Sequence, residues 1–255
     1  MNARLPHLFS PLTLRGVTIR NRILFSGHGT RMAKGAPDDR LIAYHTARAA
    51  GGAGLIVTEV AMVHESAYYT ENSLSAATDA CIPGYRRLAE AVHGHGCKLF
   101  GQLFHPGRQV LGSADGSVAV AYGPSAIPEE RYHVMPRAMP TALVRDVIAA
   151  HGTAARRLAE AGLDGVELVA SQGYLLAQFL NPRVNRRTDE YGGTFESRVG
   201  FVREIVAAIR KSTPDMVIGL RISGDERDAG GLTDEEALAV CTALDEPDVV
   251  DYMSV

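Results

Sequence analysis

Short apolar and β-branched runs alternate along the chain with longer segments in which apolar residues recur at helical spacing. Runs of the first kind predict buried strands, and segments of the second kind predict amphipathic helices. Six strands are predicted in this way, at residues 22–27, 55–60, 98–103, 165–169, 217–223 and 249–255. Strands that alternate with helices form a parallel sheet, because each right-handed crossover places a helix between two successive strands.

Five helices are predicted between these strands. Four of them cover residues 40–50, 83–95, 195–212 and 233–243. The fifth follows residue 140, with Thr141 as its expected N-cap, because a threonine hydroxyl can accept a hydrogen bond from the first turn of a helix.

The alternation leaves two architectures, an open doubly wound sheet and a closed barrel. A dinucleotide-binding sheet carries GxGxxG directly after its first strand, whereas residues 27–32 read GHGTRM and lack the third glycine. We therefore expect a (β/α)8 TIM barrel, of which about six βα units are present. Since the sixth strand ends at Val255, we expect residues 1–255 to be one barrel domain that is incomplete at its C-terminus and lacks the usual phosphate-binding loops.

A long proline-rich segment, residues 107–140, separates the third strand from its helix. Connections of this length in a compact domain are usually functional caps or lids, so we expect it over the mouth of the barrel, at the carboxyl ends of the strands. A surface excursion without a role is the alternative.

Composition excludes several classes of protein. The chain is 46% hydrophobic with a net charge of −3, which predicts a globular protein without attraction to nucleic acid or to an anionic membrane surface. No apolar run could span a membrane, and the first residues do not read as a signal peptide. Three distant cysteines, with no CxxC or HExxH motif, indicate no metal site and a reducing compartment, so we expect a cytoplasmic enzyme.

The active sites of barrels lie at the carboxyl ends of their strands, so polar residues there indicate the chemistry. A ring of amide, guanidinium, hydroxyl and imidazole groups suits a flat heterocycle, and no serine stands in a recognisable catalytic triad. The polar side chains at the predicted strand ends are Ser26, His28, Thr30, Thr58, Glu59, Gln102, His105, Arg108, Ser171, Gln172, Tyr174, Arg221 and Ser223.

Several motifs occur in a fixed order along the chain: NR at residues 21–22, QLFHPGR at 102–108, GPSA at 123–126, GYLLAQFLNP at 173–182 and NRRTDEYGGTFESR at 185–198. Together they resemble the old yellow enzyme family of FMN oxidoreductases, also described as NADH:flavin oxidoreductases. Within that family they resemble the branch of bacterial 2,4-dienoyl-CoA reductase and trimethylamine dehydrogenase. The resemblance covers essentially the whole chain and implies an FMN-binding barrel with NAD(P)H as the reductant.

The resemblance also assigns roles by position. Gln102 would bond the pyrimidine edge of FMN, and Arg221 would lie near the flavin N1/C2 carbonyl, where a positive charge stabilises the reduced, anionic flavin. Tyr174 would donate a proton to the substrate, and a phenol is fully protonated at neutral pH. The residues expected to touch the isoalloxazine ring are Ser26, Gly27, His28 and Val60.

Departures from the family narrow the substrate. Val169 and Gln172, the expected substrate-binding residues, stand where many ene-reductases carry a histidine pair that anchors an enone oxygen. Valine cannot donate a hydrogen bond, so a thioester polyene or another substrate held elsewhere is expected in place of a small cyclic enone. Gly29 replaces the flavin-linking cysteine of trimethylamine dehydrogenase, so FMN would be bound non-covalently. A 4Fe-4S cluster and FAD are expected only in a longer parent chain.

Two acidic positions and one loop are expected to be architectural. Strand alternation is expected to point Glu167 towards the helices, and Asp164 precedes the same strand. The block 185–198 is expected to be tied down through charge pairs of its arginines and carboxylates, which are Arg186, Arg187, Asp189, Glu196 and Arg198.

We expect a small-molecule substrate and leave open whether the chain forms a homo-oligomer. Three interpretations of the function remain. The first is reduction of a conjugated C=C bond with Tyr174 as proton donor. The second is amine or N-methyl oxidation, for which an aromatic bowl would lack tryptophan and rely on Tyr122 and Tyr132. The third is a truncated barrel without activity.

Overall fold

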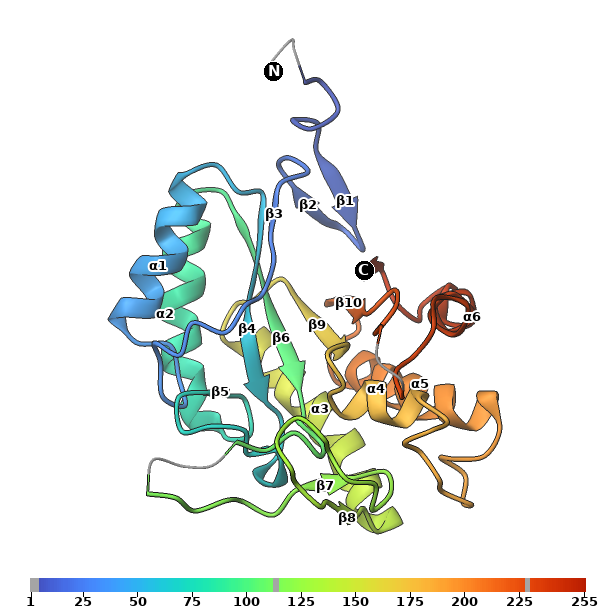
Figure 1. Cartoon of the computed structure of the whole chain (residues 1–255). Coiled ribbons are helices and arrows are strands. Elements are labelled where there is room, and N and C mark those ends of the chain that lie inside the picture. Colours follow the sequence, from blue (N-terminus) through green and yellow to red (C-terminus); the bar gives the residue numbers. More distant parts are fainter. Residues whose placement is uncertain (1–4, 112–114, 228–229) are drawn as a thin grey trace.

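Six parallel strands form the centre of the computed structural model, which describes residues 5–111, 115–227 and 230–255 (Figure 1). Their spatial order follows their order in the sequence, and every neighbouring pair is parallel. This confirms the predicted strands and their partial barrel. The strands are β3 (Leu24–Phe25), β4 (Leu55–Met62), β6 (Lys98–Phe104), β9 (Gly165–Ala170), β10 (Val217–Ile222) and β11 (Tyr252–Ser254).

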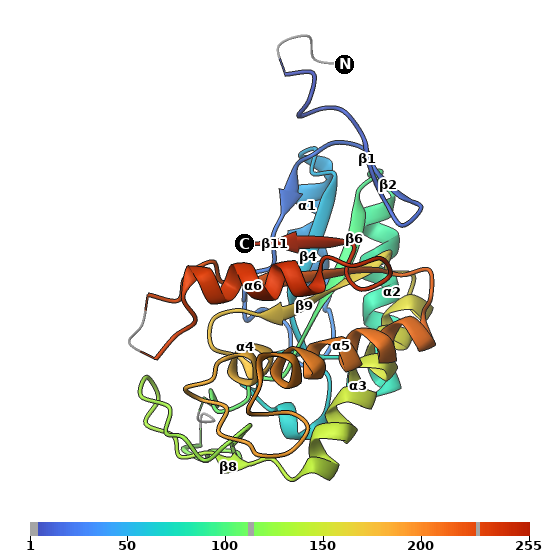
Figure 2. The same ribbon diagram turned by 90° about the vertical axis from the view of Figure 1, so that its right-hand side faces the viewer.

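Helices cover the outer face of this sheet, as two perpendicular views show (Figure 1, Figure 2). All five predicted helices are present, and the ends of the four with predicted bounds agree with the prediction to within two residues. A sixth, the six-residue α4 (Leu175–Leu180), was not predicted, because it is too short to show a helical period. The five are α1 (Asp39–Ala50), α2 (Ile82–His93), α3 (Thr141–Glu160), α5 (Phe195–Ser212) and α6 (Asp234–Leu244).

The expected N-cap of α3 is wrong by one residue. Pro140 occupies the cap position in an extended conformation, and Thr141 is the first residue of the helix. The Thr141 hydroxyl donates to the Asp189 carboxylate at 2.8 Å, so a tertiary contact takes the group that would otherwise cap the helix.

Side chains alternate between the two faces of the sheet. Val166 and Leu168 of β9 pack in the main core with the helices, whereas Glu167 between them faces the barrel interior. The prediction that Glu167 points towards the helices is therefore wrong. Glu167 pairs in register with Gln102 on β6, and the two side chains are hydrogen bonded.

A small second core closes the amino end of the barrel. It contains Ile19, Leu55, Val57, Phe100 and Val217. A hairpin of β1 (Leu12–Leu14) and β2 (Val17–Ile19), which was not predicted, supplies Ile19 and covers this end. In Figure 1 the hairpin lies opposite the arrowheads of β4 and β6.

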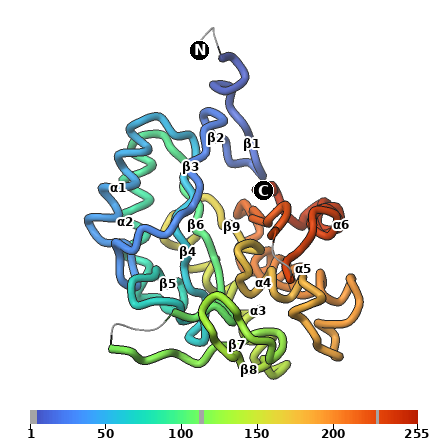
Figure 3. Tube along the Cα trace, in the orientation of Figure 1, coloured from blue at the N-terminus to red at the C-terminus, as the bar shows by residue number. Residues whose placement is uncertain are grey.

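The described parts of the long segment 107–140, which are residues 107–111 and 115–140, lie at the carboxyl ends of the strands, as predicted (Figure 1, Figure 3). It contains the short paired strands β7 (Tyr122–Gly123) and β8 (Arg137–Ala138). On the same side, a 3-10 helix at Glu65–Ala67 leads to β5 (Leu74–Ser75), which pairs with the end of β4, and a second 3-10 helix at Asp79–Cys81 precedes α2.

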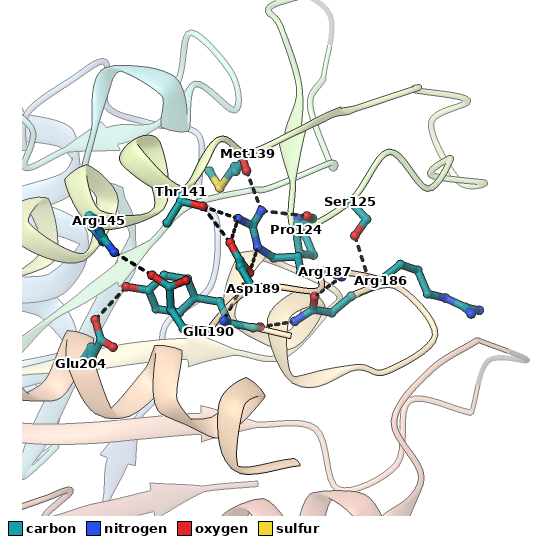
Figure 4. A network of polar contacts seen from close by, with 12 residues as sticks. Pro124, Ser125, Met139, Thr141, Arg145, Arg186, Arg187, Asp189, Glu190 and Glu204 are labelled. Atoms are coloured by element: carbon teal, nitrogen blue, oxygen red, sulfur yellow. Dashed lines mark hydrogen bonds and ion pairs between the residues drawn. The ribbon is translucent and has the colours of Figure 1, made fainter. Parts of the chain in front are cut away.

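Arg187 anchors the block 185–198 to this segment (Figure 4). Its guanidinium donates to the carbonyl oxygens of Pro124 and Met139 and pairs with Asp189. Arg187, followed by the Thr141 hydroxyl and opposed by partial burial, lowers the pKa of Asp189 to about 2.

The other arginines of the block correct the prediction in part. Arg186 donates to the carbonyl oxygen of Arg183, and Arg198 to that of Leu180. Both arginines therefore hold the loop through backbone carbonyls. Among the five residues predicted to form charge pairs, only Arg187 and Asp189 form one with each other.

Candidate active site

A cavity of about 500 Å³ opens at the carboxyl ends of the strands, a size typical of sites for small ligands and cofactors. Every residue to which the resemblance assigns a flavin, substrate or proton-donor role, except Val169, lines it, whereas the predicted strand-end residues Thr30, Thr58, His105, Arg108, Ser171 and Ser223 do not. The lining consists of Ser26, Gly27, His28, Gly29, Arg31, Glu59, Val60, Tyr69, Thr70, Asn72, Ser73, Gln102, Gln172, Tyr174 and Arg221.

An irregularity in β4 shapes one wall. The pairing of β4 with β6 shifts register between Val57 and Val60, and such bulges re-aim side chains next to active sites. As a result Glu59 and Val60 both line the cavity. The buried Glu59 carboxylate accepts a hydrogen bond from the Thr30 backbone amide at 2.6 Å, which fixes the loop after β3.

Gly27 lies where two backbone segments approach too closely for a side chain. A Cβ at this position would lie 2.4 Å from the carbonyl oxygen of Thr58 and 3.0 Å from Oε1 of Gln102. The neighbouring His28 is held from outside the cavity, because its Nε2 lies 2.9 Å from the hydroxyl of Tyr44 on α1.

Gln102 is oriented by a buried carboxylate. Its Nε2 donates to Oε1 of Glu167 at 2.7 Å, and the hydroxyl of Tyr252 donates to the other oxygen at 2.9 Å. Burial, reinforced by the negative charge of Glu167, raises the pKa of Tyr252 well above its ordinary value, so this hydroxyl stays protonated. The arrangement leaves Oε1 of Gln102 as an acceptor on the cavity side. Sequence reasoning missed Glu167 because it assigned this side chain to the wrong face.

Arg221 and Val169 are register partners on β10 and β9. Arg221 lines the cavity, and its guanidinium makes no hydrogen bond or ion pair with another residue in the described part of the chain. Val169 is 1% exposed and lies behind the lining. Arg221 therefore supplies a cation in the cavity, as predicted for the flavin site, whereas Val169 supplies no hydrogen-bond donor for a substrate.

A tight turn presents Tyr174. The turn is closed by a hydrogen bond from the amide of Tyr174 to the carbonyl of Ser171, and Gln172 and Gly173 both have positive φ, at 52° and 68°. The side chain of Gln109 bonds the carbonyl of Gln172 at 2.8 Å. These contacts direct the Tyr174 ring into the cavity.

Gln172 has one free amide end. Its Oε1 accepts from the hydroxyl of Ser171 at 2.6 Å. Its Nε2 makes no hydrogen bond with another described residue, so it can donate one into the cavity.

Tyr174 has a second phenol beside it, Tyr69, which sequence reasoning missed. Their hydroxyl oxygens lie 3.4 Å apart, and both rings pack edge-on against Phe104. Burial raises the pKa of Tyr174, while Tyr69 and the positive charges of Arg131 and Arg31 oppose that rise.

Tyr69, Thr70, Asn72 and Ser73 belong to the segment between the 3-10 helix and β5. The polar run between the second strand and the helix that follows it is the one signal in the sequence that could have indicated them.

The profile of the "NADH:flavin oxidoreductase / NADH oxidase family" matches residues 7–253. The chain belongs to this family. A metal reductase from Desulforamulus reducens is 38% identical over 95% of this chain and 36% of its own length. An N,N-dimethylglycine/sarcosine dehydrogenase from Chromohalobacter salexigens is 35% identical over 97% of this chain and 36% of its own length. An NADPH dehydrogenase from a Geobacillus species is 36% identical over 97% of this chain and 72% of its own length.

Solved structures give the same family and fold. A complex of 2-naphthoyl-CoA reductase with 2-naphthoyl-CoA superposes with a TM-score of 0.88 at 29% identity, covering 97% of this chain and 40% of that one. Morphinone reductase in complex with tetrahydroNAD superposes with a TM-score of 0.85 at 30% identity, covering 97% of this chain and 73% of that one. The chain thus spans little more than a third of the length of several curated family members.

The cavity fits FMN, the cofactor of this flavin oxidoreductase family. The isoalloxazine ring offers an N–H donor and several acceptors, and the cavity presents the Gln102 acceptor, the Arg221 cation and the Gln172 donor. Gly29 lies in the lining, and no cysteine does among the described residues, which suits non-covalent binding.

Two further observations concern the described residues alone. None of their helices is long and apolar enough to cross a membrane. Likewise, no group of three or more histidine, cysteine or acidic side chains among them is arranged to hold a metal ion.

Proposed function

We propose that this chain is the FMN-binding catalytic part of an NAD(P)H-dependent oxidoreductase that reduces a conjugated C=C bond, with Tyr174 as the proton donor. The observation that carries this proposal is the position of the Tyr174 phenol in the same cavity as Gln102 and Arg221. A proton donor and a flavin-type donor set in one cavity are the two requirements of this reaction.

Gln102 and Arg221 would hold the pyrimidine side of FMN, and Ser26, Gly27, His28 and Val60 would pack against its ring. When bound, FMN supplies the hydride that NAD(P)H provides and the substrate carbon receives. Glu167 binds the amide nitrogen of Gln102, which leaves Oε1 as the acceptor that would face the ring. Arg221 carries no competing partner among the described residues, so its charge is available to the cofactor.

Tyr174 would complete the reaction at the second carbon. Its pKa lies above the ordinary value because of burial, so the hydroxyl carries its proton at neutral pH. The turn at Ser171–Tyr174 holds the ring against Phe104, which restricts its rotation. A fixed, protonated phenol is suited to general acid catalysis.

The proposed substrate class is an enoyl or dienoyl thioester. The buried Val169 cannot bond a substrate carbonyl, and Gln172 offers one donor, so anchoring of a small enone at two points is lost. The similarity to a structure of 2-naphthoyl-CoA reductase supports a thioester.

Amine oxidation is the second candidate. Tyr69, Phe104 and Tyr174 form an aromatic corner that could contact a methylated amine. The predicted bowl residues differ: neither Tyr122 nor Tyr132 lines the cavity, although Tyr132 interacts with Tyr69. The similarity to an N,N-dimethylglycine/sarcosine dehydrogenase favours this candidate.

Anaerobic mixing of the FMN-loaded protein distinguishes these reactions. We expect NAD(P)H to bleach the flavin absorbance and an enoyl thioester to restore it. Bleaching by dimethylglycine or sarcosine without NAD(P)H would instead identify an amine dehydrogenase. Purified protein that neither retains nor takes up FMN would support the inactive barrel and contradict both.

The three cysteines are free thiols, which supports the proposed cytoplasmic location, because thiols stay reduced there.

A further inference from the structure

The cavity contains a second cation that the flavin does not require. Arg31 lines the cavity from the loop after β3. Within residues 5–111, 115–227 and 230–255, its guanidinium makes no hydrogen bond or ion pair. Arg31 is an exposed residue of the cavity lining, so its charge is accessible to a ligand that enters the cavity.

The backbone of Arg31 is in a conformation that non-glycine residues rarely adopt, with φ at 55°. It is held on one side by the bond from the amide of Thr30 to Glu59. On the other side, Gly35 donates to the carbonyl of Ser73 at 3.0 Å and accepts from the amide of Ser75 at 2.7 Å. Surroundings that enforce such a backbone are found at functional sites, so the structure fixes where this side chain begins.

Arg31 lies on the substrate side of the cavity. Its positive charge opposes the rise in pKa that burial causes in both Tyr69 and Tyr174. Arg31, Tyr69 and the proposed proton donor Tyr174 line the same cavity.

Neutral hydrogen-bonding side chains share this side. Thr70, Asn72 and Ser73 line the cavity from the segment to which the Arg31 loop is bonded, and the hydroxyls of Thr70 and Ser73 lie 3.1 Å apart. Such groups complement the charge of an arginine around an oxyanion.

The charges of the lining favour an anion. Its charged residues are Arg31, Arg221 and Glu59, and Glu59 already accepts the amide of Thr30. The nearby Glu71 pairs with Lys34 at 3.4 Å. The cavity is therefore locally positive in a chain whose net charge is −3.

We propose that Arg31, with Thr70, Asn72 and Ser73, forms a subsite for an anionic oxygen group of the substrate, a carboxylate or a phosphate. This inference rests on the proposed function in taking the Tyr174 side of the cavity as the substrate side. It supplies the anchor that Val169 cannot provide. Arginine suits this role because its planar fork can bind two oxygens of one group at once.

Calorimetric titration of the FMN-loaded protein tests the subsite without turnover. The probes are two matched pairs: crotonate against methyl crotonate, and crotonyl-CoA against the crotonyl thioester of N-acetylcysteamine, which lacks the phosphates. For Arg31→Gln we expect the charged member of a pair to bind about 10- to 100-fold more weakly, with the neutral member unchanged. Arg31→Lys should restore part of the loss.

The pair that responds identifies the group: the first pair indicates a carboxylate and the second a phosphate. Arg40→Gln, at an exposed arginine on α1 outside the lining, is the control. Equal effects on charged and neutral probes, or no effect on either pair, would overturn the subsite. Arg31-dependent binding without any C=C reduction would contradict only the proposed function.

Discussion

The hydroxyl oxygens of Tyr174 and Tyr69 lie 3.4 Å apart, and their rings meet edge to face with centroids 5.8 Å apart. Burial, followed by the hydrogen bond to Tyr174, raises the pKa of Tyr69 to about 12. Tyr69 therefore keeps its proton, while the Tyr174 hydroxyl is the donor of the bond between the two phenols. Once Tyr174 has protonated the substrate, the Tyr69 hydroxyl can turn and donate to the tyrosinate that remains, which would stabilise it.

We expect Tyr69→Phe to slow substrate reduction about 10-fold, the effect of one hydrogen bond to a charged group. In a Tyr174→Phe background the same change should have no further effect, because Tyr69 acts through Tyr174. Rates from the four variants of this cycle check the coupling. Tyr122→Phe, on β7 outside the cavity lining, is the control. Independent, additive losses would show that Tyr69 acts on the substrate directly.

Gly27→Ala is expected to destabilise the protein by about 1–3 kcal/mol, because the new methyl group overlaps the carbonyl oxygen of Thr58. The matched control is Gly29→Ala, whose added Cβ would meet no atom within 4 Å although Gly29 lines the same cavity. Urea unfolding measures both variants. Equal stability of the two would contradict the close approach at Gly27.

Glu167→Gln should weaken FMN binding about 10-fold, because Gln102 can then turn its amide and lose the fixed acceptor on the cavity side. Tyr252→Phe leaves the bond between Gln102 and Glu167 in place and should weaken binding much less. Quenching of flavin fluorescence gives both dissociation constants. An unchanged constant for Glu167→Gln would show that this carboxylate does not orient Gln102.

Three buried histidines predict acid sensitivity. Burial is the largest cause in each case, and it lowers the pKa of His105 to about 3 and those of His45 and His151 to about 4. These rings are neutral in the folded chain and charged in the unfolded chain between about pH 4 and 6.5. The unfolded state thus binds more protons in this window, so stability falls as the pH drops through it.

His45→Phe should relieve part of this loss, because neither ring nitrogen of His45 has a hydrogen-bond partner in the described structure. For a ring with pKa values of about 4 folded and 6.5 unfolded, the relief at pH 5 is about 2 kcal/mol relative to pH 8. Urea unfolding at the two pH values measures it, with His95→Gln at an exposed site as control. A variant with the same pH dependence as the original chain would refute this account of His45.

The sequence predicted the strands and long helices because their apolar periods are strong, and it located the cavity because polar residues follow each strand. It failed where the period is short or the contact is tertiary. The face of Glu167 depends on its pairing with Gln102 across β6 and β9. Tyr69 and Arg31 lie on loops joined by hydrogen bonds between Gly35 and the segment before β5, which no local pattern encodes.

Tyr174→Phe, followed through the two halves of turnover under anaerobic conditions, tests the central claim most directly. We expect reduction of the flavin by NAD(P)H to be unchanged, because Tyr174 takes no part in it. Reoxidation by an enoyl thioester should slow about 100-fold or more, the usual contribution of a general acid. Reoxidation at the rate of the original chain would contradict the role of Tyr174 as proton donor.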